Sequence, residues 1–296
     1  MDGSIKVQDL IILGSGPAAL TAALYAARDG IAVAVYEKSS IGGTISQVSH
    51  IENYPGFAGT GAELMQQMRA QAEQFGAKID YGECQSVSRR DDGNYALSID
   101  SDEVISRAVI VATGTDRRKL GIPGETLPGV SYCATCDGPL TKGEDVIVIG
   151  GGNAAAQEAL YLLKFCSRLK ILVRSTLKCD EELKKRLLAE PRVEVVCGFV
   201  PSDITRQDIL TIKNAAGDTY QAGHIFIYIG ATPATSFLST ELLAADGAVR
   251  TDEQLETAWP GVFAAGDCRD GAIRQAVIAA GEGAAAAIGV RHYLDK

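Results

Sequence analysis

Apolar residues gather in short runs in the first part of the chain, and their spacing predicts strands that alternate with a helix. Residues 9–13 form an apolar run typical of a buried strand, and residues 20–27 repeat apolar positions with a helical period. Further apolar strands are expected at 32–36 and at 109–114, where the run ends in a glycine. This order favours a parallel α/β unit.

The same pattern returns in the second half of the chain. Strands are expected at 145–149, 169–173 and 225–230, with a helix at 157–165, and the last strand again ends in a glycine. The repetition indicates an internal duplication. We therefore predict an α/β protein of two Rossmann-like, three-layer nucleotide-binding domains, the second inserted into the first.

Polar segments before and after the second repeat suggest where the chain passes from one domain to the other. One such segment surrounds Asp116, and another contains Asp246 and Gly247. The predicted first domain is discontinuous and comprises residues 1–117 and 247–296. The predicted second domain comprises residues 118–246.

A glycine-rich turn joins the first strand to the helix in each repeat. In the first turn, Gly14 allows a sharp bend and Gly16 lets a pyrophosphate approach the main chain, where the helix N-terminus offers unpaired N–H groups. Glu37 ends the next strand and can accept hydrogen bonds from a ribose diol. Gly150 and Gly152 occupy the matching positions in the second repeat, which predicts two nucleotide sites.

The second repeat differs at the position of the acidic residue. Arg174 replaces the carboxylate, and Lys178 follows it. Without a carboxylate for the ribose diol, a simple NAD site is disfavoured. An arginine at this position can instead meet the 2′-phosphate of NADP.

Two closely spaced cysteines, Cys133 and Cys136, lie between the two turns and are followed by Asp137. Such a pair can form a redox disulfide that accepts two electrons from a reduced flavin, and thiol exchange benefits from a nearby proton carrier such as Asp137. Half of a zinc site is the structural alternative. Zinc needs two further ligands at similar spacing, but the other cysteines are isolated and the chain has 3 His, so no metal is expected.

Over almost its full length, the chain resembles the low-molecular-weight thioredoxin reductases, which are two-domain FAD-dependent disulfide reductases. The matching motifs are GSGPA at 14–18, GG at 42–43, ENYPG at 52–56, ATG at 112–114, CATCD at 133–137, GGG at 150–152, GATP at 230–233, AGD at 265–267 and RQA at 274–276. We call the nucleotide site at the first glycine-rich turn the first cradle and the site at the second turn the second cradle. The resemblance implies FAD in the first cradle, a nicotinamide dinucleotide in the second, a homodimer, and thioredoxin or a thioredoxin-like protein as acceptor.

The resemblance also implies roles for individual residues. Cys136 would face the flavin, Cys133 would attack the partner's disulfide, and Asp137 would act as general acid–base. The residues assigned to FAD share positions in the family motifs: Gly14, Ser15, Gly16, Pro17, Ala18, Glu37, Lys38, Gly42, Gly43, Thr44, Asn53, Thr113, Gly114, Gly266, Asp267, Arg274, Gln275 and Ala276. Those assigned to the second nucleotide are Gly150, Gly152, Asn153, Ala154, Arg174 and Lys178.

The chain departs from the family pattern at two places, and the first leaves the electron donor open. Members that use NADPH carry a His-Arg-Arg cluster with a further Arg four residues on, whereas this chain reads RSTLKCD at 174–180. The donor is therefore NADPH or a non-nicotinamide reductant, such as ferredoxin, reduced deazaflavin or a second flavin. Cys268 replaces the usual aliphatic residue close to the expected flavin. If a nicotinamide is used, we expect one domain to rotate against the other, as in the family.

Two other functions fit parts of the pattern. A flavin-bound redox sensor or binding module without turnover could use the same dithiol to regulate association, although the joint presence of both cysteines and Asp137 favours an enzyme. A ferredoxin–NADP reductase of related fold is disfavoured because such enzymes lack the CxxC pair.

Composition narrows the setting of this chemistry. The 296 residues are sufficient for two domains, and the net charge of −9 argues against nucleic acid, whose phosphates an acidic surface repels. Seven cysteines without regular spacing fit a reducing cytoplasm. Residues 10–27 are uncharged, but Gly14, Gly16 and Pro17 interrupt them, so no membrane span is expected. The basic run at 117–119 is expected to be a solvated linker or a docking patch for an acidic partner.

Overall fold

The computed structural model describes residues 7–48 and 51–296, and the chain divides into two compact units. Unit 1 comprises Met1–Asp116 and Thr232–Lys296, and unit 2 comprises Arg117–Ala231. The chain passes between them through β9 (Thr115–Arg117) and β18 (Ala231–Pro233), which pair with each other.

The second crossing lies well before the predicted boundary at 246/247. The polar residues there form a turn inside unit 1, in which the Gly247 N–H donates to the Ala244 carbonyl at 3.0 Å. After the turn, Val249 pairs with Leu243 and donates its N–H to the Cys268 carbonyl at 2.9 Å. A polar Gly-containing loop therefore marked a local reversal and not a passage between units.

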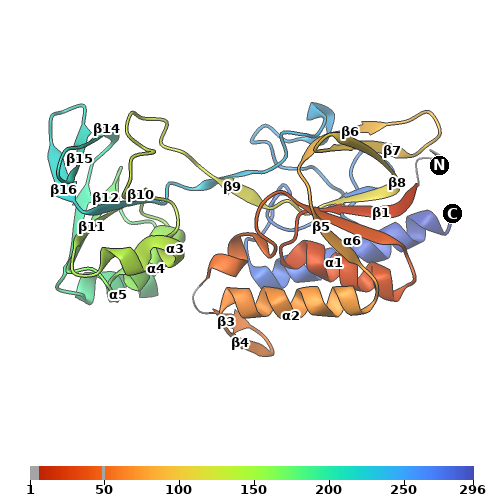
Figure 1. Ribbon diagram of the computed structural model, residues 1–296, viewed down its shortest axis with the longest axis horizontal. Helices are drawn as coiled ribbons and strands as arrows, with labels where there is room; N and C mark the ends of the chain where they lie inside the picture. The colour runs from red at the N-terminus through yellow and green to blue at the C-terminus, as the bar shows by residue number, and fades with distance from the viewer. Residues whose placement is uncertain (1–6, 49–50) are drawn as a thin grey trace. The chain divides into compact units, whose positions relative to one another are not determined.

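Unit 1 is built on a sheet with the strand order β5-β2-β1-β8-β7-β6, in which β19 also pairs with β8 (Figure 1). The strands β5, β2, β1, β8 and β19 run parallel, whereas β7 is antiparallel to β8 and β6 is antiparallel to β7. The bounds are β1 (Gln8–Leu13), β2 (Val33–Glu37), β5 (Lys78–Tyr81), β6 (Cys84–Arg89), β7 (Tyr95–Ile99), β8 (Asp102–Val111) and β19 (Val262–Ala264).

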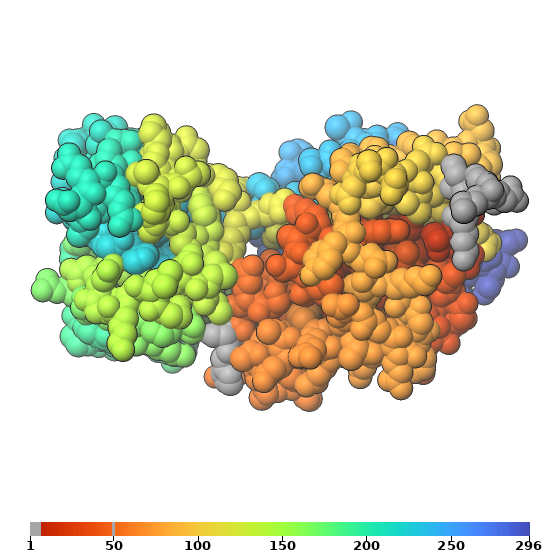
Figure 2. Space-filling model, viewed as in Figure 1, coloured from red at the N-terminus to blue at the C-terminus, as the bar shows by residue number. Residues whose placement is uncertain are grey.

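Helices cover one face of this sheet, as Figure 1 shows. They are α1 (Pro17–Arg28), α2 (Gly61–Gln74) and α6 (Ala276–Leu294). Proline at the first position of α1 and a capping box between Thr60 and Glu63 at α2 fix where these helices begin. Residues of α2 form part of the surface of the unit seen in Figure 2.

The opposite face of the sheet carries a second apolar layer. It contains side chains of β1 and β8 together with those of β7 and of the segment before β19, including Leu238 and Trp259. The Tyr95 ring stacks on the Trp259 ring with centroids 6.0 Å apart. Short elements complete the unit: η1 (Gly43–Gln47), β3 (Ile51–Tyr54), β4 (Phe57–Gly59) and η3 (Thr240–Leu242).

Unit 2 repeats the architecture with a parallel sheet of strand order β10-β17-β11-β12-β13. Its strands are β10 (Val130–Ser131), β11 (Asp145–Ile149), β12 (Arg168–Val173), β13 (Val193–Cys197) and β17 (His224–Ile227). One apolar cluster joins this sheet to α3 (Ala134–Asp137), α4 (Asn153–Leu162) and α5 (Glu181–Ala189), and η2 (Gly138–Thr141) follows α3.

A small antiparallel sheet packs on the other face of the unit 2 sheet. It consists of β14 (Pro201–Arg206), β15 (Leu210–Asn214) and β16 (Thr219–Ala222). Each unit therefore has three layers around a central sheet, which is wholly parallel in unit 2 and mostly parallel in unit 1. This confirms the predicted fold class. Among residues 7–48 and 51–296, none of the helices has the length and apolar character that crossing a bilayer requires.

Candidate functional site

The turn between β1 and α1 forms the first cradle, and Gly14 is required at its bend. Its φ is +101°, and a Cβ there would lie 2.3 Å from the Ala112 carbonyl oxygen, so no side chain fits. At Gly16 no atom lies within 4 Å of the Cβ position, and a Cβ built on Gly43 would lie 3.8 Å from the Gly16 Cα. The turn therefore presents an open backbone surface at the N-terminus of α1.

Glu37 lies at the end of β2 and is 6 % exposed. Its carboxylate accepts hydrogen bonds from Ser15 Oγ at 2.7 Å and from the Ser39 N–H at 2.9 Å, which compensates its burial. Ser15 Oγ also accepts the Gly42 N–H at 2.9 Å. The structure thus links three of the residues assigned to FAD, although Ser15 and Ser39 already occupy part of the carboxylate intended for the ribose.

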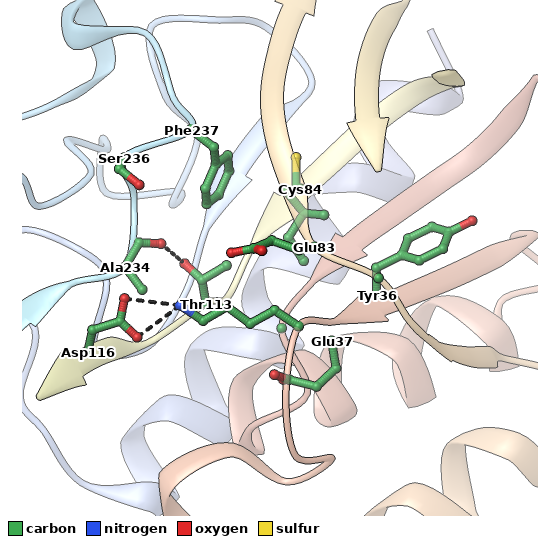
Figure 3. Close-up of a pocket in the computed structure, with 13 residues that line it drawn as sticks. Tyr36, Glu37, Glu83, Cys84, Thr113, Asp116, Ala234, Ser236 and Phe237 are labelled. Carbon is green, nitrogen blue, oxygen red and sulfur yellow. Dashed lines mark hydrogen bonds and ion pairs between the residues drawn. The ribbon is translucent and has the colours of Figure 1, made fainter. Parts of the chain in front are cut away.

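A pocket opens beside Glu37 in unit 1 (Figure 3). Lys38 at its edge forms an ion pair with Asp116, with Nζ–Oδ1 at 2.9 Å, and Thr113 Oγ1 donates to the Ala234 carbonyl at 2.7 Å. The labelled lining residues are Tyr36, Glu37, Glu83, Cys84, Thr113, Asp116, Ala234, Ser236 and Phe237.

The sequence did not identify several of these lining residues. Ser236 and Phe237 follow the second crossing, and Glu83 and Cys84 follow the edge strand β5. None belongs to a motif. Burial raises the pKa of the Cys84 thiol to about 11, so this pocket cysteine stays protonated at neutral pH.

The C-terminal residues assigned to FAD come together with Asn53. The Asn53 amide donates to Gln275 Oε1 at 3.1 Å, across 222 positions of sequence. Helix α6 begins at Ala276, with Gln275 as its N-cap. Asp267 is half-buried, and burial raises the pKa of its carboxyl group, an effect that Arg274 opposes.

A salt bridge that sequence reasoning missed supports Gly266. The Gly266 N–H donates to Glu282 Oε2 at 2.7 Å, and Arg269 Nη2 binds Glu282 Oε1 at 2.5 Å. Both charged side chains are less than one-fifth exposed. Ala18, which the sequence assigned to FAD, is only 4 % exposed and belongs to the same buried apolar cluster as Ala279.

The remaining residues assigned to FAD lie in turns and helix starts. Pro17 is the first residue of α1, Thr44 lies in η1, and the carbonyl of Gly114 accepts the Ala234 N–H at 3.1 Å.

In unit 2, Cys133 and Cys136 form a disulfide, with Cα atoms 5.3 Å apart. Cys133 precedes α3, and the Cys136 N–H donates to Cys133 Sγ at 3.2 Å. Asp137 is the last residue of α3, and its Oδ2 accepts the Ser131 hydroxyl at 2.6 Å. The three residues assigned to catalysis are therefore together on one short segment.

Tyr228 connects this segment to the end of β17. Its hydroxyl accepts the Ala134 N–H at 2.7 Å. Burial raises the pKa of the Tyr228 hydroxyl, and the nearby carboxylates of Glu158 and Asp137 add to this effect. Burial likewise raises the pKa of Glu158, with Arg117 opposing it.

The second cradle repeats the first in its backbone. Gly150 has φ +132°, and a Cβ there would lie 2.0 Å from the Tyr228 carbonyl oxygen, while no atom lies within 4 Å of the Cβ position at Gly152. A pocket opens along this turn, and its lining includes every residue assigned to the second nucleotide: Gly150, Gly152, Asn153, Ala154, Arg174 and Lys178.

Polar contacts fix the loop that carries the basic side chains of Arg174 and Lys178 in this pocket. Asn153 exchanges two hydrogen bonds of 2.8 Å with Asp180, and the Lys178 N–H donates to the Gly151 carbonyl at 2.6 Å. Arg174 and Lys178 are both exposed. Arg118 also lines the pocket, so one residue of the basic run predicted as a linker or docking patch lies at a candidate ligand site.

The other cysteines are free thiols: Cys84, Cys166, Cys179, Cys197 and Cys268. Cys268 is fully buried among apolar side chains, and burial raises the pKa of its thiol to about 11. No cluster of His, Cys, Asp and Glu suited to a metal ion was found among the described residues.

Comparison with known proteins places this geometry in a family. The model of the pyridine nucleotide-disulphide oxidoreductases matches residues 8–283. Thioredoxin reductase of Bacillus subtilis is 35% identical over 305 residues, which cover 98% of this chain and 96% of that protein.

Solved structures agree with this placement. Thioredoxin reductase of Lactococcus lactis has a TM-score of 0.91 at 35% identity and covers 97% of this chain and 99% of its own. The enzyme of T. acidophilum has a TM-score of 0.88 at 31% identity, covering 97% and 98%. Since these matches extend over nearly the whole chain, the protein belongs to the pyridine nucleotide-disulphide oxidoreductases, in the family of low-molecular-weight thioredoxin reductases.

Proposed function

We propose that this protein passes two electrons through FAD to the Cys133–Cys136 disulfide and from there to the disulfide of a thioredoxin-like protein. The disulfide itself carries the proposal, because Asp137 follows it directly on the same short segment and the chain belongs to a family of disulphide oxidoreductases. The donor is NADPH or a non-nicotinamide reductant.

The residues of unit 1 fit FAD. The open backbone at Gly16 and Gly43 would receive the pyrophosphate, and the pocket beside Glu37 would receive the adenosine. Asp267 and the first N–H groups of α6 would meet the ribityl chain and the pyrimidine edge of the flavin. Bound FAD would supply the electrons that reduce the disulfide.

The local geometry supports Cys133 as the thiol that attacks the partner. The Cys136 N–H points to Cys133 Sγ at 3.2 Å, and in the reduced protein a donor at this position favours a thiolate on Cys133. The thiolate is the nucleophile in disulfide exchange. Asp137 follows Cys136 directly and would carry the proton that the leaving sulfur needs.

An anaerobic titration of the purified yellow protein tests the route of the electrons. NADPH, NADH and reduced ferredoxin are added separately, and the flavin absorbance and the thiol content are followed. A donor on the proposed route bleaches the flavin and exposes two new thiols per chain. Bleaching without new thiols would contradict transfer to Cys133 and Cys136. If neither nicotinamide bleaches the flavin, the donor is of another class.

The acceptor is tested with oxidised thioredoxin and the reduced protein. We expect two thiols to appear on thioredoxin for each disulfide formed on this chain. A protein that cycles its own thiols but leaves thioredoxin oxidised would point to the redox sensor instead.

The apolar surface of α6 supports a homodimer. Val277 and Ile288 are 39% and 37% exposed, and Val277 lines a groove of unit 1 together with Tyr25 and Tyr54. A second copy of the chain would cover such a surface. Light scattering should give twice the mass of 31.1 kDa, and Ile288→Glu should lower it. A wild-type mass of one chain would exclude the dimer.

The five free cysteines fit a cytoplasmic protein.

A further inference from the structure

The hydroxyl of Ser131 lies between two of the residues assigned to catalysis. Ser131 ends β10 and is 7% exposed. Its Oγ is 2.6 Å from Asp137 Oδ2 and 3.4 Å from the Cys133 carbonyl oxygen, and it accepts the Cys133 N–H at 3.0 Å. The side chain therefore contacts both the proton carrier and the backbone of the attacking cysteine.

A serine hydroxyl has one proton to donate and can accept as well. When Asp137 is a carboxylate, the hydroxyl donates to it, as the distance of 2.6 Å indicates. When Asp137 is protonated, its O–H can donate to Ser131, whose own proton can turn to the Cys133 carbonyl. Both protonation states of Asp137 thus retain a hydrogen bond without movement of the backbone.

We propose that Ser131 is a positioning residue that holds Asp137 in place through the proton transfer to the leaving sulfur. This inference rests on the role of Asp137 in the proposed function and adds a residue that no sequence motif indicated. Alanine at this position would leave a half-buried carboxyl group without the partner that adapts to its charge.

Ser131 acts in the exchange that begins once the proton of Cys133 has passed to Asp137. The Cys133 thiolate attacks one sulfur of the partner's disulfide, a new S–S bond forms, and the partner's S–S bond breaks. The electron pair stays on the leaving sulfur, which takes a proton from Asp137. Cys136 then attacks Cys133 Sγ, restores the protein's disulfide and releases the partner's second sulfur, which receives the proton from Cys136 by way of Asp137.

Two disulfide probes separate positioning of Asp137 from general damage. The flavin-containing protein is reduced with dithiothreitol and desalted, so no electron donor is needed. Hydroxyethyl disulfide releases a basic thiolate that needs a proton, whereas 5,5′-dithiobis(2-nitrobenzoate) releases an acidic thiolate that leaves without one. Rates are corrected with the Cys133→Ser protein, which retains the exposed Cys197.

For Ser131→Ala, we expect the rate with hydroxyethyl disulfide to fall about tenfold or more, as the loss of a hydrogen bond to a charged group implies. The rate with the aromatic disulfide should stay within about twofold, and Ser131→Thr should restore the first rate. Ser167→Ala is the matched control, because it removes another serine–aspartate hydrogen bond of 2.6 Å, to Asp145 in the same unit. Equal losses with both probes would mean that Ser131 only shapes the loop and would overturn the proposal.

Asp137→Asn separates failure of this inference from failure of the proposed function. If Ser131 acts through Asp137, Ser131→Ala should cause no further loss in the Asp137→Asn protein. A further loss in the double variant would overturn the inference. If Asp137→Asn itself spares both probes, the role of Asp137 fails; if it slows only hydroxyethyl disulfide and Ser131→Ala does not, Ser131 alone fails.

Discussion

The two cradles share a backbone and differ in the side chains around it. Gly14 and Gly150 both adopt positive φ at sites where a carbonyl oxygen excludes any Cβ. At the following strand end, however, the first cradle has the buried Glu37, whereas the second has the exposed Arg174. The shared backbone is what a pyrophosphate requires, and the differing side chains decide which nucleotide follows it.

This difference indicates how strongly each ligand is specified. Glu37 is fixed by Ser15 and Ser39 before any ligand binds, and that bonding connects it to the loop at Gly42. Arg174, by contrast, is exposed and lines its pocket. This contrast supports the proposal that the first cradle holds a resident cofactor and that the second takes a ligand that binds and leaves.

The largest effect is expected from a change in the disulfide, because such a variant should lose turnover and still bind the flavin. Cys136→Ser removes the second sulfur, so reduction of thioredoxin should fall below detection while the flavin stays bound. Turnover and the flavin-to-protein absorbance ratio are measured together, with Cys197→Ser as the control. Unchanged turnover would refute the role of Cys136.

A matched pair of glycine variants tests the division of labour between the cradles. Gly14→Ala forces a Cβ towards the Ala112 carbonyl and should lower the flavin content at least tenfold. Gly150→Ala forces one towards the Tyr228 carbonyl and should leave the flavin bound but weaken nucleotide binding. Flavin absorbance and nucleotide titration report the two outcomes. Loss of flavin in both variants, with normal melting, would contradict separate roles.

The side chains at the strand ends should have smaller effects. Glu37→Gln should weaken FAD binding by about tenfold, because hydrogen bonds to a charged group are lost. Arg174→Ala should weaken NADPH by a similar factor and leave NADH unchanged, if Arg174 meets the 2′-phosphate. Dissociation constants from fluorescence titration are compared. Equal weakening of NADPH and NADH would assign Arg174 to the pyrophosphate instead.

The smallest effect is expected in the pH dependence of stability, through the half-buried Glu158 of unit 2. Burial raises the pKa of Glu158 in the folded protein, so the native state binds the proton more tightly than the unfolded chain. The stabilisation of the folded protein by this proton is present at low pH and is lost as the pH rises through the raised pKa. Glu158→Gln should therefore melt at a higher temperature than wild type near neutral pH and equally at acidic pH. A constant difference across this range would argue against the effect of burial.

Much of the fold could be predicted because its signals are local. The apolar run at β1, the bend at Gly14 and the helix that starts at Pro17 are adjacent in sequence, and each restricts the backbone by itself. The second repeat carries the same signals around Gly150. The disulfide could also be predicted from the sequence, because two residues between the cysteines allow the thiols to meet within one turn of the chain.

The second crossing could not be placed in this way. Asp246 and Gly247 have the composition of a linker, and only the pairing of Val249 with Leu243 shows that they turn within unit 1. The pocket residue Arg118 was read as part of a basic run for a similar reason, because its neighbour in space, Gly230, is remote in sequence.

By itself the sequence determined two glycine-bent α/β units, a redox cysteine pair and the exchange of an acid for Arg174, because short-range sterics and residue chemistry act between neighbours along the chain. Only the tertiary structure decided that Asn53 meets Gln275 and that Glu282 supports Gly266. Those contacts form when sheets and helices bury their apolar faces, and that packing brings together polar side chains whose separation in sequence carries no signal.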